Sequence, residues 1–145
     1  MTGYWKLNIT SERNYSKDLR MTNFMKVKDF MSTFHQEVKE KPEYPGLDIA
    51  ALRYELIREE LQELYEATGE VDMVEIADAL TDLLYVVYGA GHAYGIDLDA
   101  CFSHVHASNM SKLSAEGKPI YREDGKILKG ENYWAPNMKQ FIGEV

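Results

Sequence analysis

The sequence predicts an all-α protein, an antiparallel four-helix bundle with a small C-terminal β-hairpin. Four segments between residues 22 and 113 repeat apolar side chains at steps of three and four, the period of an amphipathic α-helix. The links between these segments are short, and short links place consecutive helices antiparallel. Farther along, Asp124-Gly125 lies between two short runs with apolar residues, which is typical of a two-residue hairpin turn.

Length and composition indicate a single domain. The chain has 145 residues, of which 45% are hydrophobic and 28% are charged, as in globular proteins. We divide it into an N-terminal arm (1–20), a helical core (22–113) and a hairpin with a tail (114–145). Helices this rich in aromatic side chains are expected to bury further surface against a second copy of the chain.

The first helix is expected to follow Thr22-Asn23, which can cap its N-terminus. Its apolar positions recur along one face: Phe24, Val27, Phe30, Met31 and Phe34. Pro42 and the later Pro45-Gly46 break helices, so this helix should end by Lys41.

The second helix is expected from about residue 49 to 67, with Asp48 as its N-cap and Gly69 as its C-cap. The third helix is expected from Met73 to Tyr94, capped by Asp72. Its second half is apolar almost all round, so we expect it to be the central and most buried helix.

The fourth helix is expected to begin after Asp97 or Asp99 and to end near Leu113. The segment KPIYREDGKILKG then predicts the β-hairpin around Asp124-Gly125, and the remaining tail is expected to be irregular.

Composition also excludes several classes of protein. A net charge of -8 argues against a general nucleic-acid or anionic-membrane binder. The longest apolar run, Leu83 to Ala93, is too short to span a bilayer. The single Cys101 excludes an intramolecular disulfide, and the N-terminus lacks a signal-type apolar core, so we predict a cytoplasmic protein.

Six acidic residues form the main chemical feature. They are Glu59, Glu60 and Glu63 on the second helix and Glu75, Asp78 and Asp82 on the third. Their spacing of three and four places each set on one face, and the two helices can face each other as an antiparallel pair. Such a set repels itself unless a cation is bound, and Mg²⁺ prefers carboxylate oxygens together with substrate phosphates. A solvated acidic face is the alternative interpretation.

Charge is also divided along the chain. Residues 37–82 contain 14 acids and 4 bases, whereas residues 109–129 contain five bases and three acids. An acidic segment followed by a basic one suits a site for a metal and a phosphate.

Four segments together resemble a known family: LIREELQEL, EIADALTDLLYVVYG, NMSKL and GKPIYREDGKILKG. They are similar to the all-α nucleoside-triphosphate pyrophosphohydrolases, which comprise MazG-like enzymes, dimeric dUTPase relatives and phosphoribosyl-ATP pyrophosphohydrolases. The family signature, ExxE followed by ExxD, is matched by Glu60-x-x-Glu63 and Glu75-x-x-Asp78. The resemblance covers about residues 24 to 135.

The resemblance implies a four-helix bundle of MazG-like type that forms a homodimer or a dimer of dimers. It implies Mg²⁺-dependent cleavage of a nucleoside triphosphate between its α- and β-phosphates, with Mn²⁺ as a substitute metal. The family's metal ligands carry over to the four signature residues: Glu60, Glu63, Glu75 and Asp78. Glu59 matches the position that handles the attacking water.

Further residues are candidates for substrate contacts. Asn109 and Lys112 in the NMSKL segment are candidate nucleotide or phosphate contacts, although a lysine also suits a helix C-terminus. Lys126 in the basic hairpin segment is a candidate phosphate contact, and Lys118, Arg122 and Lys129 are further candidates there. His35 ends a helix that resembles the family's base-binding helix. Asp82 is either a further ligand or a carboxylate beside the ligands.

Two hypotheses follow from the sequence. The first is a Mg²⁺-dependent nucleotide pyrophosphohydrolase, and the second is a metal-stabilised helical dimerisation or adaptor protein without catalysis. A cleft open to solvent favours the first, and a metal site closed by protein ligands favours the second. The nucleobase is not readable from the sequence, although the length and tail favour a deoxynucleotide over phosphoribosyl-ATP.

Overall fold

The computed structural model describes residues 20–143. The helices in this part of the chain are α2 (Asn23–Thr33), α3 (Leu47–Glu70), α4 (Met73–Tyr94), α5 (Leu98–Met110) and α6 (Lys139–Ile142). The all-α class is confirmed. The arm predicted for residues 1–20 lies, apart from Arg20, outside the described residues. None of the described helices is long and apolar enough to cross a membrane.

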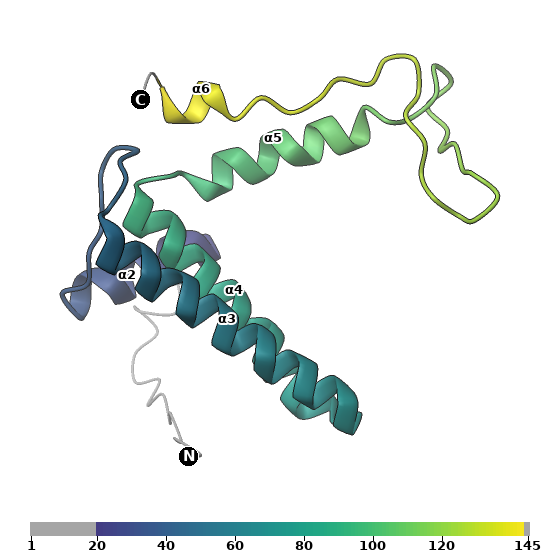
Figure 1. The fold of residues 1–145 in the computed structure, drawn as a ribbon. Coiled ribbons are helices and arrows are strands. Elements are labelled where there is room, and N and C mark those ends of the chain that lie inside the picture. Colours follow the sequence, from purple (N-terminus) through teal and green to yellow (C-terminus); the bar gives the residue numbers. More distant parts are fainter. Residues whose placement is uncertain (1–19, 144–145) are drawn as a thin grey trace.

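Helices α3 and α4 form a long antiparallel pair, and α2 packs against the C-terminal half of α4 (Figure 1). The side chains buried at these contacts form a small core: Phe24, Val27, Met31, Ala67, Ala79 and Ala93. Helix α4 is central, as predicted, because it packs against both neighbours. Its outer face is open within one chain, since Leu80 and Leu84 are 46% and 54% exposed.

The bounds of α4 are those predicted from the sequence. The Asp72 side chain accepts hydrogen bonds from the backbone N–H groups of Val74 and Glu75, which caps the helix. Gly95 ends it with a φ of 68°, where a Cβ would lie 2.0 Å from the Lys41 carbonyl oxygen. Glycine is therefore required at this position both for conformation and for space.

Helix α2 ends at Thr33, well before the prolines that were expected to limit it. The Gln36 N–H donates to the Met31 carbonyl at 2.8 Å and the His35 N–H donates to the Ser32 carbonyl at 3.3 Å, the paired bonds of a Schellman motif. His35 supplies the left-handed residue that this motif needs, with a φ of 57°. Local capping geometry, rather than a proline, therefore terminates the helix.

Helix α3 is longer than predicted at both ends. It begins at Leu47 after Gly46, so Asp48 lies in the first turn instead of capping the helix. Gly69 lies inside the helix, and the chain turns at Val71, whose φ is 56°. An interior glycine costs a helix only about 1 kcal/mol, and the Asp72 cap of α4 places the break two residues beyond the predicted one.

Helix α5 leaves the end of α4 and extends away from the α3–α4 pair (Figure 1). It begins after its Asp97 cap and ends at Met110, slightly earlier than predicted. The C-terminal segment runs back along it, with the Ser108 hydroxyl donating to the Trp134 carbonyl at 2.9 Å. One chain therefore does not close the predicted four-helix bundle, because the extensive helix contacts among residues 20–143 are α3–α4 and α2–α4.

The predicted β-hairpin is corrected by the structure. No β-strand occurs between residues 20 and 143, and the segment forms a single antiparallel bridge between Tyr121 and Ile127. The turn also has three residues instead of two, because the Arg122 N–H donates to the Lys126 carbonyl across it. Gly125 occupies the left-handed position with a φ of 83°. An isolated pair of short strands without a third partner is marginal in water, which explains the missing ladder.

Candidate functional site

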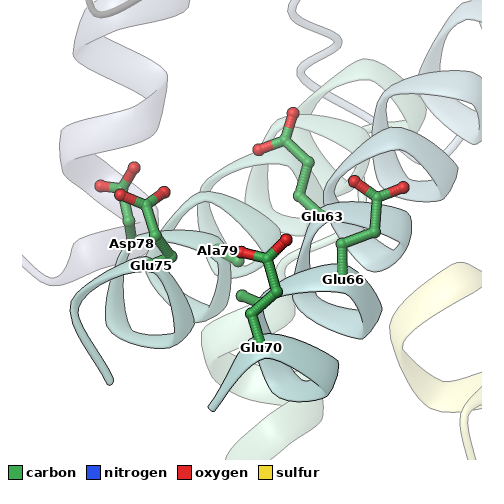
Figure 2. A pocket seen from close by; sticks show the side chains of 7 residues that line it. Glu63, Glu66, Glu70, Glu75, Asp78 and Ala79 are labelled. Atoms are coloured by element: carbon green, nitrogen blue, oxygen red, sulfur yellow. The ribbon is translucent and has the colours of Figure 1, made fainter. Parts of the chain in front are cut away.

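Five carboxylates from two helices line one open pocket of about 290 Å³ between α3 and α4 (Figure 2). We call it the acidic pocket, and its acids are Glu63, Glu66 and Glu70 of α3 with Glu75 and Asp78 of α4. No basic side chain lines it. Two like charges about 5 Å apart repel by about 3 kcal/mol at an effective dielectric constant near 20. The pocket is therefore suited to a positively charged ligand.

The helices bring these carboxylates together because small residues lie between them. Ala67 of α3 and Ala79 of α4 also line the acidic pocket and are 6% and 4% exposed. Short side chains allow two helix backbones to approach closely, so longer side chains on either side of the contact reach over the same space.

A second pocket of about 320 Å³ adjoins the same helices on the side of α2. We call it the mixed pocket because apolar walls surround a few charged and polar groups. Glu60 of α3 and Asp82 of α4 are its acids. Its remaining lining residues come from α2, α3, α4 and the loop after α2: Val27, Phe30, Met31, Gln36, Arg53, Leu56, Tyr85, Val86 and Gly89.

Glu60 connects the two pockets electrostatically. Burial raises the pKa of Glu60, and the negative charges of Glu63 and Asp82 raise it further. The Glu60 Oε2 atom is buried without a hydrogen-bond partner. A buried acceptor without a partner is costly, so this oxygen is available to a donor or a cation.

Asp82 is also perturbed. Burial raises the pKa of Asp82, and the charge of Asp78 adds to this effect. It lines the mixed pocket together with Glu60.

The donor set of the site suits a hard divalent cation. All of its candidate ligands are carboxylate oxygens, and Mg²⁺ binds such oxygens and completes its shell with water and phosphates. The unpartnered Glu60 oxygen fits the same ion. Between residues 20 and 143, however, no three acidic, histidine or cysteine side chains converge tightly enough to hold one ion by themselves. Three signature residues, Glu63, Glu75 and Asp78, share one pocket, and Glu60 lines the neighbouring one.

Two predicted residues lie beside the pockets rather than in them. Glu59 is exposed on α3 and lines neither pocket, although its charge contributes to the raised pKa of Glu60. His35 is exposed in the turn after α2, and the adjacent Gln36 lines the mixed pocket instead.

The segment with the basic candidates follows α5, which extends away from the α3–α4 pair that carries the acids (Figure 1). The Lys112 Nζ donates to the Asn109 Oδ1 at 2.9 Å at the far end of α5. Lys126 is exposed next to the 123–125 turn, and Arg122 forms an ion pair with Asp124. A single chain therefore does not bring its basic segment to its acidic pocket.

The sequence prediction missed three charged residues of the pockets. Arg53 is buried in the mixed pocket at 7% exposure, and Glu66 and Glu70 line the acidic pocket. Helical spacing contained the signal, because Arg53 lies seven residues before Glu60, and Glu66 and Glu70 lie three and seven residues after Glu63.

The comparisons with known proteins identify the family of this chain. The family model described as phosphoribosyl-ATP pyrophosphohydrolase matches residues 27–109, which contain both pockets. The uncharacterized protein L479 of Acanthamoeba polyphaga mimivirus is 31% identical over 144 residues, covering 91% of this chain and 52% of that protein. The chain thus spans about half the length of this curated relative. Its helical core, its paired acidic motifs and the family match show that the chain belongs to the phosphoribosyl-ATP pyrophosphohydrolase family, within the all-α nucleoside-triphosphate pyrophosphohydrolase superfamily.

Proposed function

We propose that this protein is a Mg²⁺-dependent pyrophosphohydrolase that cleaves a deoxynucleoside or nucleoside triphosphate between its α- and β-phosphates. The products are the nucleoside monophosphate and pyrophosphate. The main observation behind this proposal is the acidic pocket, which is lined by carboxylates of α3 and α4 and by no basic side chain. Family membership supports it, because that membership implies activity of the nucleotide pyrophosphohydrolase type.

Glu60, Glu63, Glu75 and Asp78 would hold the metal, with Mn²⁺ as a substitute. A bound Mg²⁺ supplies neutralisation of phosphate charge and acidification of bound water. Glu66 and Glu70 add negative charge to the same pocket, which strengthens its attraction for a cation.

The chain's own catalytic task is small, because phosphoryl transfer depends mainly on positioning and electrostatics. Water forms a new bond to phosphorus, the bridging P–O bond breaks, and pyrophosphate leaves. Glu59 lies beside Glu60 on the exposed surface of α3, where its carboxylate can accept the proton of the attacking water.

A homodimer or a dimer of dimers would complete the site. Large apolar side chains are exposed on α4 and α5, including Leu84 at 54%, Phe102 at 75% and Met110 at 52%. Exposed apolar surface of this extent is typical of subunit interfaces. A second copy that covers these faces would bring Asn109, Lys112 and Lys126 toward the acids of the first copy and thereby supply the phosphate contacts.

The exposure of the acids favours hydrolysis over a structural role for the metal. Glu63, Glu75 and Asp78 are all solvent-exposed, so the acidic pocket leaves room for water and phosphates around an ion. A metal that only stabilised an adaptor would be enclosed by protein ligands.

The proposal is tested by incubating the full chain with Mg²⁺ and each of the common deoxynucleoside and nucleoside triphosphates, as well as phosphoribosyl-ATP, and measuring pyrophosphate. We expect turnover of at least one deoxynucleoside triphosphate and a loss of at least 100-fold in Glu60→Gln. Glu55→Gln is the matched control, because Glu55 lies on α3 outside both pockets and pairs with Arg58. Absence of pyrophosphate from every nucleotide, with no difference between Glu60→Gln and the unmodified protein, would refute the proposal.

A further inference from the structure

We infer that Arg53 is a substrate-binding residue, whose guanidinium donates a hydrogen bond to an acceptor atom of the nucleobase in the mixed pocket. Every natural base carries such an acceptor, so this contact holds the base without selecting among bases. The inference rests on the proposed function, since it assigns the nucleoside-binding part of the same site.

Arg53 is a buried cation without a counter-charge. It is 7% exposed, and burial lowers the pKa of Arg53. Its side chain donates from Nη2 to a neutral group, the Gln36 Oε1, at 3.3 Å, and its Nε is buried without a partner. No carboxylate of residues 20–143 forms an ion pair with it. A buried charge is costly unless it is paired and hydrogen-bonded, so this guanidinium suits an acceptor that a ligand supplies.

Arg53 and Glu60 lie toward opposite ends of the mixed pocket. They are seven residues apart on α3, which corresponds to about 10 Å of helix. On α4, Gly89 lies beside the Arg53 guanidinium, because a Cβ there would come within 3.1 Å of Nη1. Asp82 precedes Gly89 by the same seven residues and also lines the pocket. The mixed pocket therefore has a cationic end at Arg53 and an acidic end at Glu60 and Asp82.

This arrangement determines which part of a nucleotide can reach Arg53. Glu60 is one of the proposed metal ligands, and the other three line the acidic pocket, farther along α3 and α4. A triphosphate bound to that metal would lie at the acidic end of the mixed pocket or beyond it. The base is at the end of a nucleotide opposite the triphosphate, so the base is the part that extends toward Arg53.

The walls of the mixed pocket suit a flat and partly apolar group. Phe30 and Tyr85 both line it and meet edge to face, with centroids 5.5 Å apart. They are 37% and 38% exposed, so part of each ring is open to a ligand. Leu56 and Val86 add aliphatic surface. Bases of every kind stack on such rings, because each has a π face.

The polar groups of the pocket are compatible with every natural base. Guanine, cytosine, thymine and uracil present oxo groups to a donor such as Arg53, and adenine presents ring nitrogens that accept. Glu60 and Asp82 are acceptors, which can pair with donors of the nucleoside. We therefore expect Arg53 to contribute to the affinity for all bases, adenine included.

Arg53 has a competing structural role. Its guanidinium lies against α4 at Gly89, and its hydrogen bond to Gln36 connects α3 to the loop after α2. A structural role predicts equal losses for every triphosphate when Arg53 is replaced, whether or not the triphosphate carries a base. Binding of the base predicts a loss for nucleotides but not for 2-deoxyribose 5-triphosphate, which has the sugar and the phosphates alone. This base-free compound therefore separates the two roles.

The experiment measures kcat and KM with Mg²⁺ for dATP, dGTP, dCTP, dTTP and 2-deoxyribose 5-triphosphate in the unmodified protein, Arg53→Lys and Arg53→Met. For each nucleotide that is hydrolysed, we expect Arg53→Met to raise KM about tenfold or more with little change in kcat, the result of losing a contact made equally in the ground and transition states. Arg53→Lys should be intermediate, because it keeps the charge but not the fork of donors. Both variants should leave kcat/KM for the base-free compound unchanged within about threefold.

Arg58→Met is the matched control, because Arg58 is exposed on α3 and pairs with Glu55. If the base-free compound is not hydrolysed, its inhibition constant against the best nucleotide gives the same comparison. If Arg53→Met does not fold, Arg53→Lys replaces it. Equal losses for the nucleotides and the base-free compound, or no loss for any of them, would overturn the inference and leave the hydrolase intact.

Binding without metal separates this inference from the proposed function. Calorimetry compares the four deoxynucleoside monophosphates with 2-deoxyribose 5-phosphate in the unmodified protein and in Arg53→Lys. Binding of the nucleotides that depends on Arg53, without hydrolysis of any triphosphate, would support the inference and refute the hydrolase. Absence of both nucleotide binding and hydrolysis would overturn both.

Discussion

Glu60 of α3 and Asp82 of α4 line the same pocket from opposite helices, and the charge of Asp82 raises the pKa of Glu60. Burial is the larger cause of this shift. The fold therefore holds both groups in an arrangement that costs stability when they are ionised and unpaired. Groups with raised pKa values in a pocket are characteristic of functional sites.

The first prediction concerns the cost of this arrangement. Without metal at pH 7, Glu60→Gln should unfold at a higher temperature than the unmodified protein, because it removes a partly buried charge that is repelled by its neighbours. A gain of about 1 kcal/mol corresponds to about 2–4 °C. Millimolar Mg²⁺ should raise the melting temperature of the unmodified protein and have little effect on the variant. Thermal unfolding by circular dichroism measures both, with Glu55→Gln as the control.

The raised pKa of Glu60 determines whether the free energy of unfolding rises or falls with pH. The folded state binds more protons than the unfolded chain, so the free energy of unfolding increases as pH falls through the folded pKa. The advantage of Glu60→Gln should therefore shrink between pH 7 and pH 4.5. A constant advantage over this range would contradict the role of ionised Glu60.

The second prediction concerns His92, for which stability changes with pH in the opposite direction. Burial lowers the pKa of His92, whose Nε2 lies 2.7 Å from the Phe24 carbonyl oxygen and whose ring stacks on the Phe24 ring. The folded state then binds fewer protons than the unfolded chain, whose His pKa is about 6.5. Stability is fully present above that value and is lost as pH falls through it.

We expect His92→Gln to be less stable at pH 7.5 by about 1–2 kcal/mol, because stacking and packing are lost. The same variant should lose less stability than the unmodified protein between pH 7.5 and pH 5.5. Denaturant titrations at the two pH values measure this difference. His106→Gln is the control, since His106 is exposed, and equal slopes for His92→Gln and the unmodified protein would show that His92 does not titrate in this range.

The third prediction compares two glycines. At Gly91 a Cβ would come within 2.6 Å of the Leu98 side chain and 3.2 Å of Phe24, whereas at Gly69 nothing lies within 4 Å. Gly91→Ala should therefore lose about 1–3 kcal/mol through overpacking. Gly69→Ala should gain about 0.5–1 kcal/mol, because alanine favours the helix in which Gly69 lies. Chemical denaturation tests the pair, and a stabilised Gly91→Ala would show that the α4–α5 junction is looser than described.

The fourth prediction concerns the proposed sharing of the site between subunits. Glu60→Gln and Lys112→Ala should each be inactive alone. If the acids of one subunit meet Lys112 of the other, an equal mixture refolded together should recover about a quarter of full activity, because half of its two-fold dimers carry one intact site. Pyrophosphate release from the mixture measures this recovery. If a mixture shown to contain hybrid dimers recovers no activity, Lys112 and the acids of one site do not come from different subunits.

Sequence patterns predicted helix bounds correctly where interactions between neighbouring residues determine them. The bounds of α4 follow from the Asp72 cap, the apolar period and Gly95, all of which are read from adjacent residues. The ends of α2 and α3 were not predicted, because His35 and Val71 adopt left-handed conformations that most side chains avoid. The hairpin was overpredicted, because its turn signal is local but a stable ladder needs partners that residues 20–143 do not provide.

The sequence by itself determined the helices, the acids and their faces, since helical spacing depends only on the order of residues. Only the tertiary structure decided which carboxylates share a pocket, that Arg53 is buried in the pocket that Glu60 also lines, and that α5 extends away from the α3–α4 pair. Burial and mutual repulsion depend on which helices approach and how closely. Here that approach depends on small residues, Ala67 and Ala79 between the acids and Gly89 beside Arg53, whose importance appears only when the helices are packed.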